Sequence, residues 1–304
     1  MASVTIVDRP EAQFRISKSR QRPKQRWMLP REHGAYAAFL FPVLTVLAAG
    51  RPTLEGWLLI FASCAFFLAH EPMLVVLGLR GSRVKRERGT TARGWLVLYG
   101  FAALVLGVTG LWIAAQEVQY AAMVPLVFAL MAFMLSGEGL GKTPPGQAVI
   151  AIALALVALP VGLACGLSFA TSICVVGVWA LVGMLGTSVV RLTLDRTKLQ
   201  ARPDDLARAQ WRAAATLGVS LVVIGAAVAA PVVDRLPLWV LAAAWPTAIA
   251  AALILLVGPQ PGRLRTIGWT LVGANVCTWL GVVGVLRLLA GVDAFWNAVS
   301  FPYF

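Results

Sequence analysis

Glu71 is an acidic residue inside an otherwise apolar stretch, with His70 before it and Pro72 after it. At about 1.5 Å per helical residue, it lies about 13 Å before Arg80, the next basic residue. A carboxylate held among apolar residues suits metal ligation or proton transfer, and a neighbouring imidazole suits acid–base chemistry. Glu71 and His70 are therefore candidate catalytic residues. Because Pro72 has no N–H to donate, we expect the helix to break there and to leave carbonyls free near the acid.

A second polar group, Arg31, Glu32 and His33, directly precedes the apolar stretch that begins at residue 34. Pro30 suits the start of a helix, and Glu32 near that start complements the helix dipole, which is a structural role. The three side chains would also make an adaptable polar site, because histidine titrates near neutral pH. We therefore count His33 among the candidate catalytic residues.

A third group is Arg191 and Asp195, four residues apart at the end of another apolar stretch. Side chains at this spacing are neighbours on a helix and can simply pair with each other. They can also face a ligand, and the sequence leaves both interpretations open. In the second interpretation Asp195 and Glu71 would be metal ligands, and Arg191 would bind an anionic cofactor.

The segment Ser136–Thr143 reads SGEGLGKT and almost matches a phosphate-binding loop, with Ser136 in place of the first glycine. A phosphate-binding loop follows a strand and opens a helix, whereas this segment follows an apolar helix and runs into two prolines. We interpret it as a flexible loop between helices. Its Lys142, like Arg80 and Arg83, remains available to an anionic ligand.

All four cysteines lie within apolar stretches or at their edges: Cys64, Cys165, Cys174 and Cys277. There is no CxxC pair and no histidine nearby in the sequence, so a zinc site is not supported. A disulfide between Cys165 and Cys174 is conceivable, but buried free thiols are the favoured interpretation.

The elements that must position these residues are apolar helices. Hydrophobic residues make up 59% of the 304 residues, charged residues 13%, and the mean hydropathy is +0.80. This leaves too little charge to cover a water-facing surface and excludes an ordinary soluble enzyme. Continuous apolar stretches long enough to cross a bilayer predict an all-α polytopic membrane bundle with nine transmembrane helices. The stretches are 34–50, 54–79, 95–115, 119–136, 147–167, 169–192, 211–232, 237–258 and 266–290.

The net charge of +13 fixes an orientation for this bundle. With the N-terminus inside, 23 of the 26 Lys and Arg residues fall on the cytoplasmic side, which is the arrangement that membrane insertion favours. We therefore expect a protein of the cytoplasmic membrane with an external C-terminus, and we expect its basic residues to contact membrane lipid and no nucleic acid. The predicted parts are a basic tail over 1–29, the membrane domain over 30–292 and a short external tail over 293–304.

Two of these stretches resemble the YwiC-like family of bacterial membrane proteins. They are Pro30–Tyr36 with Phe41–Leu44, which read PREHGAY and FPVL, and Phe66–Arg80, which reads FFLAHEPMLVVLGLR and is followed by basic residues. The hydrophobic layout is similar along residues 28–290. The resemblance implies a membrane topology more than an activity.

The chain also resembles, more distantly, the UbiA prenyltransferase superfamily. That resemblance implies nine membrane helices around a cytoplasm-side cavity, with acidic motifs at helices two and six that hold magnesium and a prenyl diphosphate. Here His70-Glu71-Pro72 stands in place of the first motif, and Arg191 with Asp195 in place of the second. Each motif has one acid where two or three are expected, which weakens the case for a pair of magnesium ions.

The leading hypothesis from the sequence is a UbiA-like intramembrane protein that binds an isoprenoid or another lipid-soluble substrate and transfers a prenyl group. Glu71 and Asp195 would bind Mg, and basic residues would hold the diphosphate: Arg80, Arg83, Lys85, Arg86, Lys142 and Arg191.

One alternative is a proton-coupled transporter, in which Glu71 beside a broken helix is the ion site and His33 or His70 relays protons. Another is an accessory protein for haem or a quinone-like molecule, with His33 and His70 as ligands.

Overall fold

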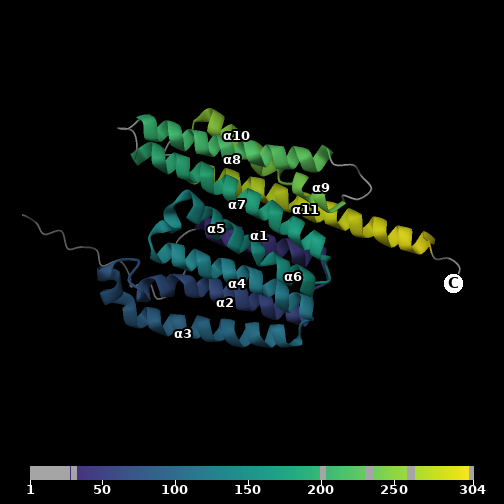
Figure 1. Ribbon diagram of the computed structural model, residues 1–304, viewed down its shortest axis with the longest axis horizontal. Coiled ribbons are helices and arrows are strands. Elements are labelled where there is room, and N and C mark those ends of the chain that lie inside the picture. The colour runs from purple at the N-terminus through teal and green to yellow at the C-terminus, as the bar shows by residue number, and fades with distance from the viewer. Residues whose placement is uncertain (1–27, 29–32, 199–202, 230–235, 259–263, 301–304) are drawn as a thin grey trace, which may run out of the picture.

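The computed structural model describes residues 28, 33–198, 203–229, 236–258 and 264–300. Over these ranges the regular elements are eleven α-helices and one short 3-10 helix, η1, which confirms the predicted all-α class (Figure 1). The bounds are α1 (His33–Ala49), α2 (Leu54–Val76), α3 (Ser82–Ile113), α4 (Gln116–Gly137), η1 (Leu140–Lys142), α5 (Pro144–Leu156), α6 (Ala158–Ala164), α7 (Phe169–Lys198), α8 (Pro203–Ala229), α9 (Leu236–Ala242), α10 (Trp245–Val257) and α11 (Leu264–Ser300).

Eight helical segments in the described part of the chain are long and apolar enough to cross a membrane. In two of them a pair of helices, α5 with α6 and α9 with α10, makes one span. The remaining predicted segment, the first in the chain, is α1. Its 17 residues extend about 25 Å, less than the roughly 30 Å of a bilayer core. The protein is thus a multi-pass membrane protein with eight full-length spans and one shorter apolar helix among its described residues, and a ninth full span stays a prediction.

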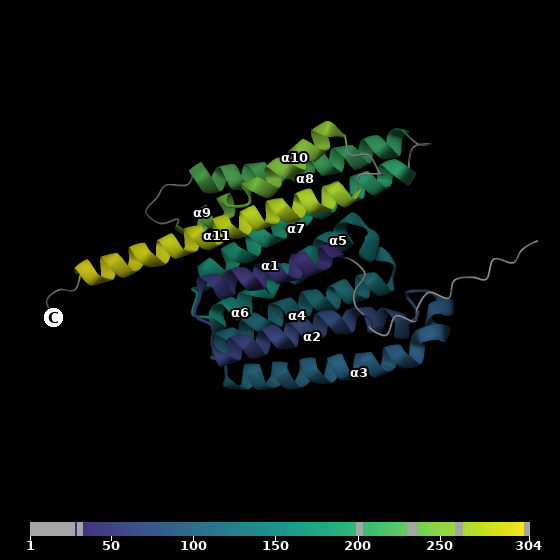
Figure 2. The same ribbon diagram turned by 180° about the vertical axis from the view of Figure 1, so that it is seen from behind.

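Helix α7 is the centre of the bundle. It packs against α1, α5, α6, α8, α9, α10 and α11, and Figures 1 and 2 show it between the layer of α8 and α10 and the layer of α2 and α4. The Trp179 indole of α7 stacks on Phe41 of α1 and donates a 2.9 Å hydrogen bond to the Thr45 hydroxyl. Helix α3, in contrast, lies at one edge, where α2 is its main neighbour.

The effect of the prolines differs from the sequence prediction. Helix α2 is continuous from Leu54 to Val76 with Pro72 inside it, so the predicted break beside Glu71 is wrong. Packing against α3 along the hairpin holds the helix together although Pro72 donates no hydrogen bond. The interruptions lie before two other prolines. Helix α5 gives way to α6 three residues before Pro160, and α9 to α10 just before Pro246.

Three charged segments that the sequence placed outside the apolar spans are also helical. Helix α3 already begins at Ser82, so the basic run that follows Arg80 lies on its first turns. Helix α7 continues to Lys198, and α11 continues through 293–300, the predicted external tail. The predicted basic tail over 1–29 lies outside the described residues except for Met28.

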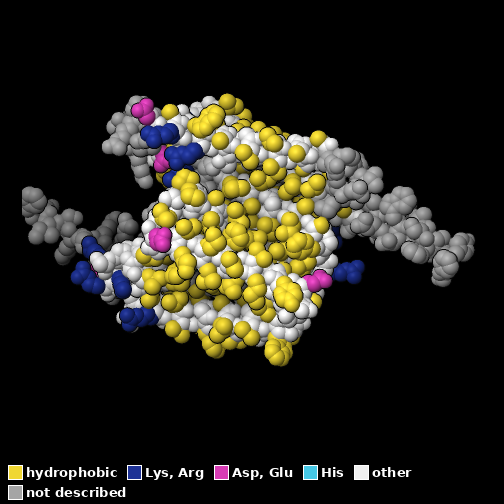
Figure 3. All heavy atoms as spheres, viewed as in Figure 1, with side chains coloured by type: hydrophobic (Ala, Val, Ile, Leu, Met, Phe, Trp, Pro, Cys, Tyr) yellow, Lys and Arg dark blue, Asp and Glu magenta, His cyan; other side chains and the backbone are white. Residues whose placement is uncertain are grey.

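Lys and Arg side chains gather at one end of the bundle, over the ends of α2 and α3 and the ends of α7 and α8 (Figure 3). We call this the basic end; it is made by the α2–α3 turn, the α4–α5 loop and the facing ends of α7 and α8. The candidate polar residues from the sequence that the structure describes all lie toward this end.

Candidate functional site

Glu71 is a buried carboxylate that forms an ion pair with Arg80. One Arg80 guanidinium nitrogen, Nη2, lies 2.5 Å from the Glu71 Oε2 atom, and the Arg80 and Glu71 side chains are 29% and 7% exposed respectively. Arg80 therefore neutralises the acid that the sequence predicted to bind metal or move protons. A charge-assisted hydrogen bond of this length fixes both side chains.

The chain brings Arg80 back over Glu71 by a tight turn at the end of α2. The Gly78 and Leu79 amides donate to the Val75 and Leu74 carbonyls, at 3.0 and 2.9 Å. Gly78 and Gly81 have φ of 83° and 100°, in the left-handed region that glycine adopts without a Cβ clash. Because the chain reverses here, a residue nine positions after Glu71 folds back along the same helix.

An aromatic cluster joins α1 to α2 one helical turn before Glu71. The Phe67 ring of α2 meets the Tyr36 ring edge-on at 5.3 Å and stacks on Phe39 at 5.1 Å. Tyr36 also interacts electrostatically with Glu71 and with Tyr99 of α3. The two stretches that carried the family resemblance, PREHGAY and AHEP, therefore meet in space.

Helix α3 carries a further aromatic pair, Trp95 and Tyr99, whose stacked rings have centroids 5.2 Å apart. Trp95 also packs on a small separate core of Met28, Val75 and Ala92, which ties the start of the chain to the ends of α2 and α3. Sequence reasoning missed these aromatic residues, although the i,i+4 spacing of Phe67 with Glu71 was available as a signal.

Of the four other candidate residues of this region, the structure describes the side chains of two. Arg83 was predicted to bind an anion, but its Nε atom pairs with Glu87 Oε1 at 2.9 Å on the exposed face of α3. His70 is half-buried next to Glu71. His33 begins α1 and Lys142 ends η1, but the side chains of both lie outside the described residues.

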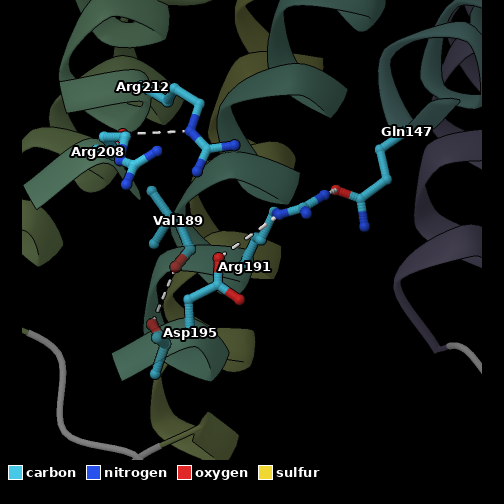
Figure 4. Close-up of polar contacts among 7 residues, drawn as sticks. Gln147, Val189, Arg191, Asp195, Arg208 and Arg212 are labelled. Carbon is cyan, nitrogen blue, oxygen red and sulfur yellow. Dashed lines mark hydrogen bonds and ion pairs between the residues drawn. The ribbon is translucent and has the colours of Figure 1, made fainter. Parts of the chain in front are cut away.

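Arg191 and Asp195 form a different kind of pair on α7 (Figure 4). The Arg191 Nε atom lies 3.6 Å from Asp195 Oδ2, and its Nη1 atom donates to Gln147 Oε1 of α5 at 3.0 Å. Of the two open interpretations, the structure therefore has the i,i+4 pair. Arg191 joins two helices at the basic end, with Arg208 and Arg212 of α8 nearby.

The two acids do not form a magnesium site in this arrangement. Each is held by an arginine of its own helix or turn, and in the described part of the chain no three His, Cys, Asp or Glu side chains lie close enough to hold a metal. Magnesium needs several oxygen ligands with free lone pairs, so these residues do not fit the ion. All four cysteines are free thiols; Cys165 and Cys174 are buried, as the favoured interpretation predicted, whereas Cys64 is half-buried and Cys277 is exposed.

The segment resembling a phosphate-binding loop is a tight connection between two helices. It links α4 to α5 through η1, and Thr143 caps α5 by accepting a hydrogen bond from the Gly146 amide at 3.4 Å. A Cβ on Gly146 would collide with the Leu140 carbonyl, so the glycine serves close packing. The segment links two helices, as predicted, and its flexibility stays a prediction.

A comparison with known families adds to this geometry. Residues 29–162 match the family described as YwiC-like protein. The match confirms, over these residues, the resemblance to this family that the sequence predicted. It runs from the start of the chain's first helix into α6, so it contains the Glu71–Arg80 pair and its aromatic neighbours, whereas Arg191 and Asp195 lie beyond it. No curated protein and no solved structure matches the chain. The likeness to the UbiA superfamily stays a prediction.

Proposed function

We propose that this protein binds an isoprenoid or a similar lipid-soluble molecule at the basic end of α1, α2 and α3, with the polar group of the ligand against Arg80. One observation carries the proposal: the Arg80 Nε atom is buried and has no hydrogen-bond partner among the described residues, while Nη2 is held by Glu71. Buried N–H donors are nearly always satisfied, and one left unpaired costs about 1–3 kcal/mol. An oxygen of a ligand at this position would satisfy it.

The surrounding side chains suit the apolar part of such a ligand. Tyr36, Phe67 and Tyr99 come from three different helices; the Tyr36 and Phe67 rings meet, and Tyr36 interacts electrostatically with Glu71 and Tyr99. Ring faces and edges pack well against the methyl groups and double bonds of an isoprenoid chain. A ligand with an apolar chain and one oxygen-bearing end matches this combination of rings and a single spare donor.

Prenyl transfer with magnesium is not part of this proposal, because both acids are engaged by arginines. The alternative of a proton-coupled transporter depended on a helix break at Pro72, which α2 does not have. We propose a bacterial cytoplasmic-membrane protein with the N-terminus inside, because the basic end carries the Lys and Arg side chains that are retained in the cytoplasm.

The test is equilibrium binding of a tritiated prenyl alcohol and a short-chain quinone to the purified full-length protein in detergent. We expect saturable binding that is unchanged by EDTA, and at least tenfold weaker binding by Trp95→Ala, which removes the indole that stacks on Tyr99. Trp112→Ala is the matched control, because Trp112 lies at the far end of the same helix and is 85% exposed.

A second variant, Glu71→Gln with Arg80→Gln, exchanges the ion pair for two amides of similar size and leaves no unpaired charge. We expect it to remain folded and to lose binding at least tenfold, because a glutamine amide in place of the Arg80 side chain cannot reproduce the guanidinium donor. Absence of saturable binding to the wild-type protein, or equal binding by Trp95→Ala and Trp112→Ala, would overturn the proposal.

A further inference from the structure

A small basic pocket lies beside this site, where the first turns of α3 pass the end of α2. Its volume is about 110 Å³, and it is lined by Val76 of α2 and by Lys85, Arg86, Gly89, Thr90 and Arg93 of α3. The α3 residues lie at positions i, i+1, i+4, i+5 and i+8, which form one stripe along a helix. Ligand pockets for whole drug-sized molecules have about 300–1,000 Å³, so this one is the size of a head group.

Gly89 creates the hollow at the centre of the stripe. A Cβ built there would come no nearer than 4.0 Å to another atom, the Lys85 Cγ. The α3 backbone at Gly89 is ordinary helix, so neither backbone conformation nor close packing requires glycine at this position. Glycine costs a helix about 1 kcal/mol relative to alanine. A ligand that occupies the space above it gives this glycine a role.

The charged side chains that line the pocket are all positive. Lys85, Arg86 and Arg93 supply three cations, and no ion pair between described residues engages any of them. The acid of the same helical run, Glu87, is paired with Arg83, which does not line the pocket, and it also interacts electrostatically with Arg86, which does. Arg83, which the sequence singled out as an anion ligand, thus shields Glu87, while its neighbours line the pocket.

We infer that this pocket binds a phosphoryl group: a phosphate or diphosphate ester. Three cations neutralise a dianion, two of them as guanidinium forks that match its oxygens, and the Thr90 hydroxyl adds a donor. Val76 forms the side toward the apolar bundle, where the ester carbon would lie. The inference rests on the proposed function in one respect: it takes this phosphoryl group to be the head group of the lipid-soluble molecule proposed above.

The experiment compares a radiolabelled prenyl monophosphate with the corresponding prenyl alcohol on purified full-length protein in detergent. We expect the phosphate to bind at least tenfold more tightly than the alcohol, and inorganic phosphate to compete for the difference. Gly89→Leu fills the hollow without changing charge, and Lys85→Gln with Arg93→Gln removes two cations. Both variants should lose the tenfold advantage and retain alcohol binding.

Arg83→Gln is the matched control, because it removes one positive charge from the same helical turns outside the pocket. We expect it to change phosphate binding less than twofold. A loss by Arg83→Gln as large as that by the double variant would show diffuse surface attraction and overturn the pocket. Wild-type phosphate binding by Gly89→Leu would overturn it as well.

A third arm identifies the source of the phosphoryl group. If the pocket serves a membrane phospholipid, nanodiscs of phosphatidylglycerol should block prenyl phosphate binding, whereas nanodiscs of phosphatidylcholine should not. If it serves the prenyl ester, the two kinds of nanodisc should give the same affinity. Phosphate binding that persists without any alcohol binding would contradict the proposed function and leave the phosphoryl site standing. All variants are first checked for folding by gel filtration and thermal unfolding.

Discussion

The two acid–arginine pairs at the basic end of the bundle differ in how they are built. Glu71 is 7% exposed, and its partner Arg80 reaches it from a turn nine residues later, at 2.5 Å. Arg191 and Asp195 are 28% and 23% exposed, lie one helical turn apart at 3.6 Å, and share Arg191 with Gln147 of a neighbouring helix. The α7 pair is a link between α5 and α7, whereas the α2 pair is a buried charge pair that keeps one donor unused. The comparison teaches that an acid and an arginine at the end of a helix can have different roles, and that burial and the neighbouring residues decide which role they have.

The strongest test of this difference is Arg80→Ala. Removing one partner of a buried pair costs about 3–5 kcal/mol because it strands the other charge, and the partial exposure of Arg80 places the expected loss near the lower end, about 3 kcal/mol. The free energy of unfolding, measured by SDS titration of the protein in mixed micelles, checks this. Arg83→Ala, which breaks an exposed pair, should leave that free energy nearly unchanged. Equal losses for the two variants would contradict a buried pair.

A smaller effect is expected at the second pair. Arg191→Ala removes a partly exposed i,i+4 pair and one hydrogen bond to Gln147, which together contribute about 1–1.5 kcal/mol. The same unfolding measurement applies, with Gln147→Leu as the variant that removes the interhelical bond alone. Binding of the prenyl alcohol should stay within twofold of wild type. A tenfold loss of that binding would place α7 in the ligand site and remove the contrast between the two regions.

The smallest effect is expected for Pro72→Ala. Because α2 is already continuous through Pro72, an alanine restores one N–H to the helix without moving Glu71, and stability should rise by about 1 kcal/mol or less. Prenyl alcohol binding should be unchanged within twofold. A large loss of binding with this variant would mean that the proline itself shapes the site, as the hypothesis of a proton-coupled transporter required.

Some of this arrangement follows from the sequence, and some depends on packing between helices. Hydropathy suffices to locate the apolar segments, because each segment is a local property of the chain, although α1 is shorter than a full span. Glu71 stands out for the same reason. Its pairing with Arg80 could not be predicted, because it depends on a turn at Gly78 and Gly81 that reverses the chain.

The prolines and the aromatic residues show the limit most clearly. Pro72 and Pro160 both lack an N–H, yet α2 continues through Pro72, whereas the fifth apolar segment is interrupted before Pro160. The packing of neighbouring helices decides whether a helix stays continuous at a proline. The meeting of Tyr36, Phe67 and Tyr99 depends on which helices lie side by side, and no spacing within one helix contains that information.

The continuity of the site along the chain has a consequence for how the protein is made. Its rings, its ion pair and its basic pocket all come from residues 36–99, that is, from three consecutive helices. The ion pair and the basic pocket lie within the α2–α3 hairpin, so they can form once α3 has been made. Helix α1, which carries Tyr36, packs mainly on α5, α6, α7 and α11, which are made later. A nascent chain that ends before α4 therefore contains every residue of the proposed site, but the helices that hold α1, and with it the Tyr36 ring, beside Phe67 are still to come.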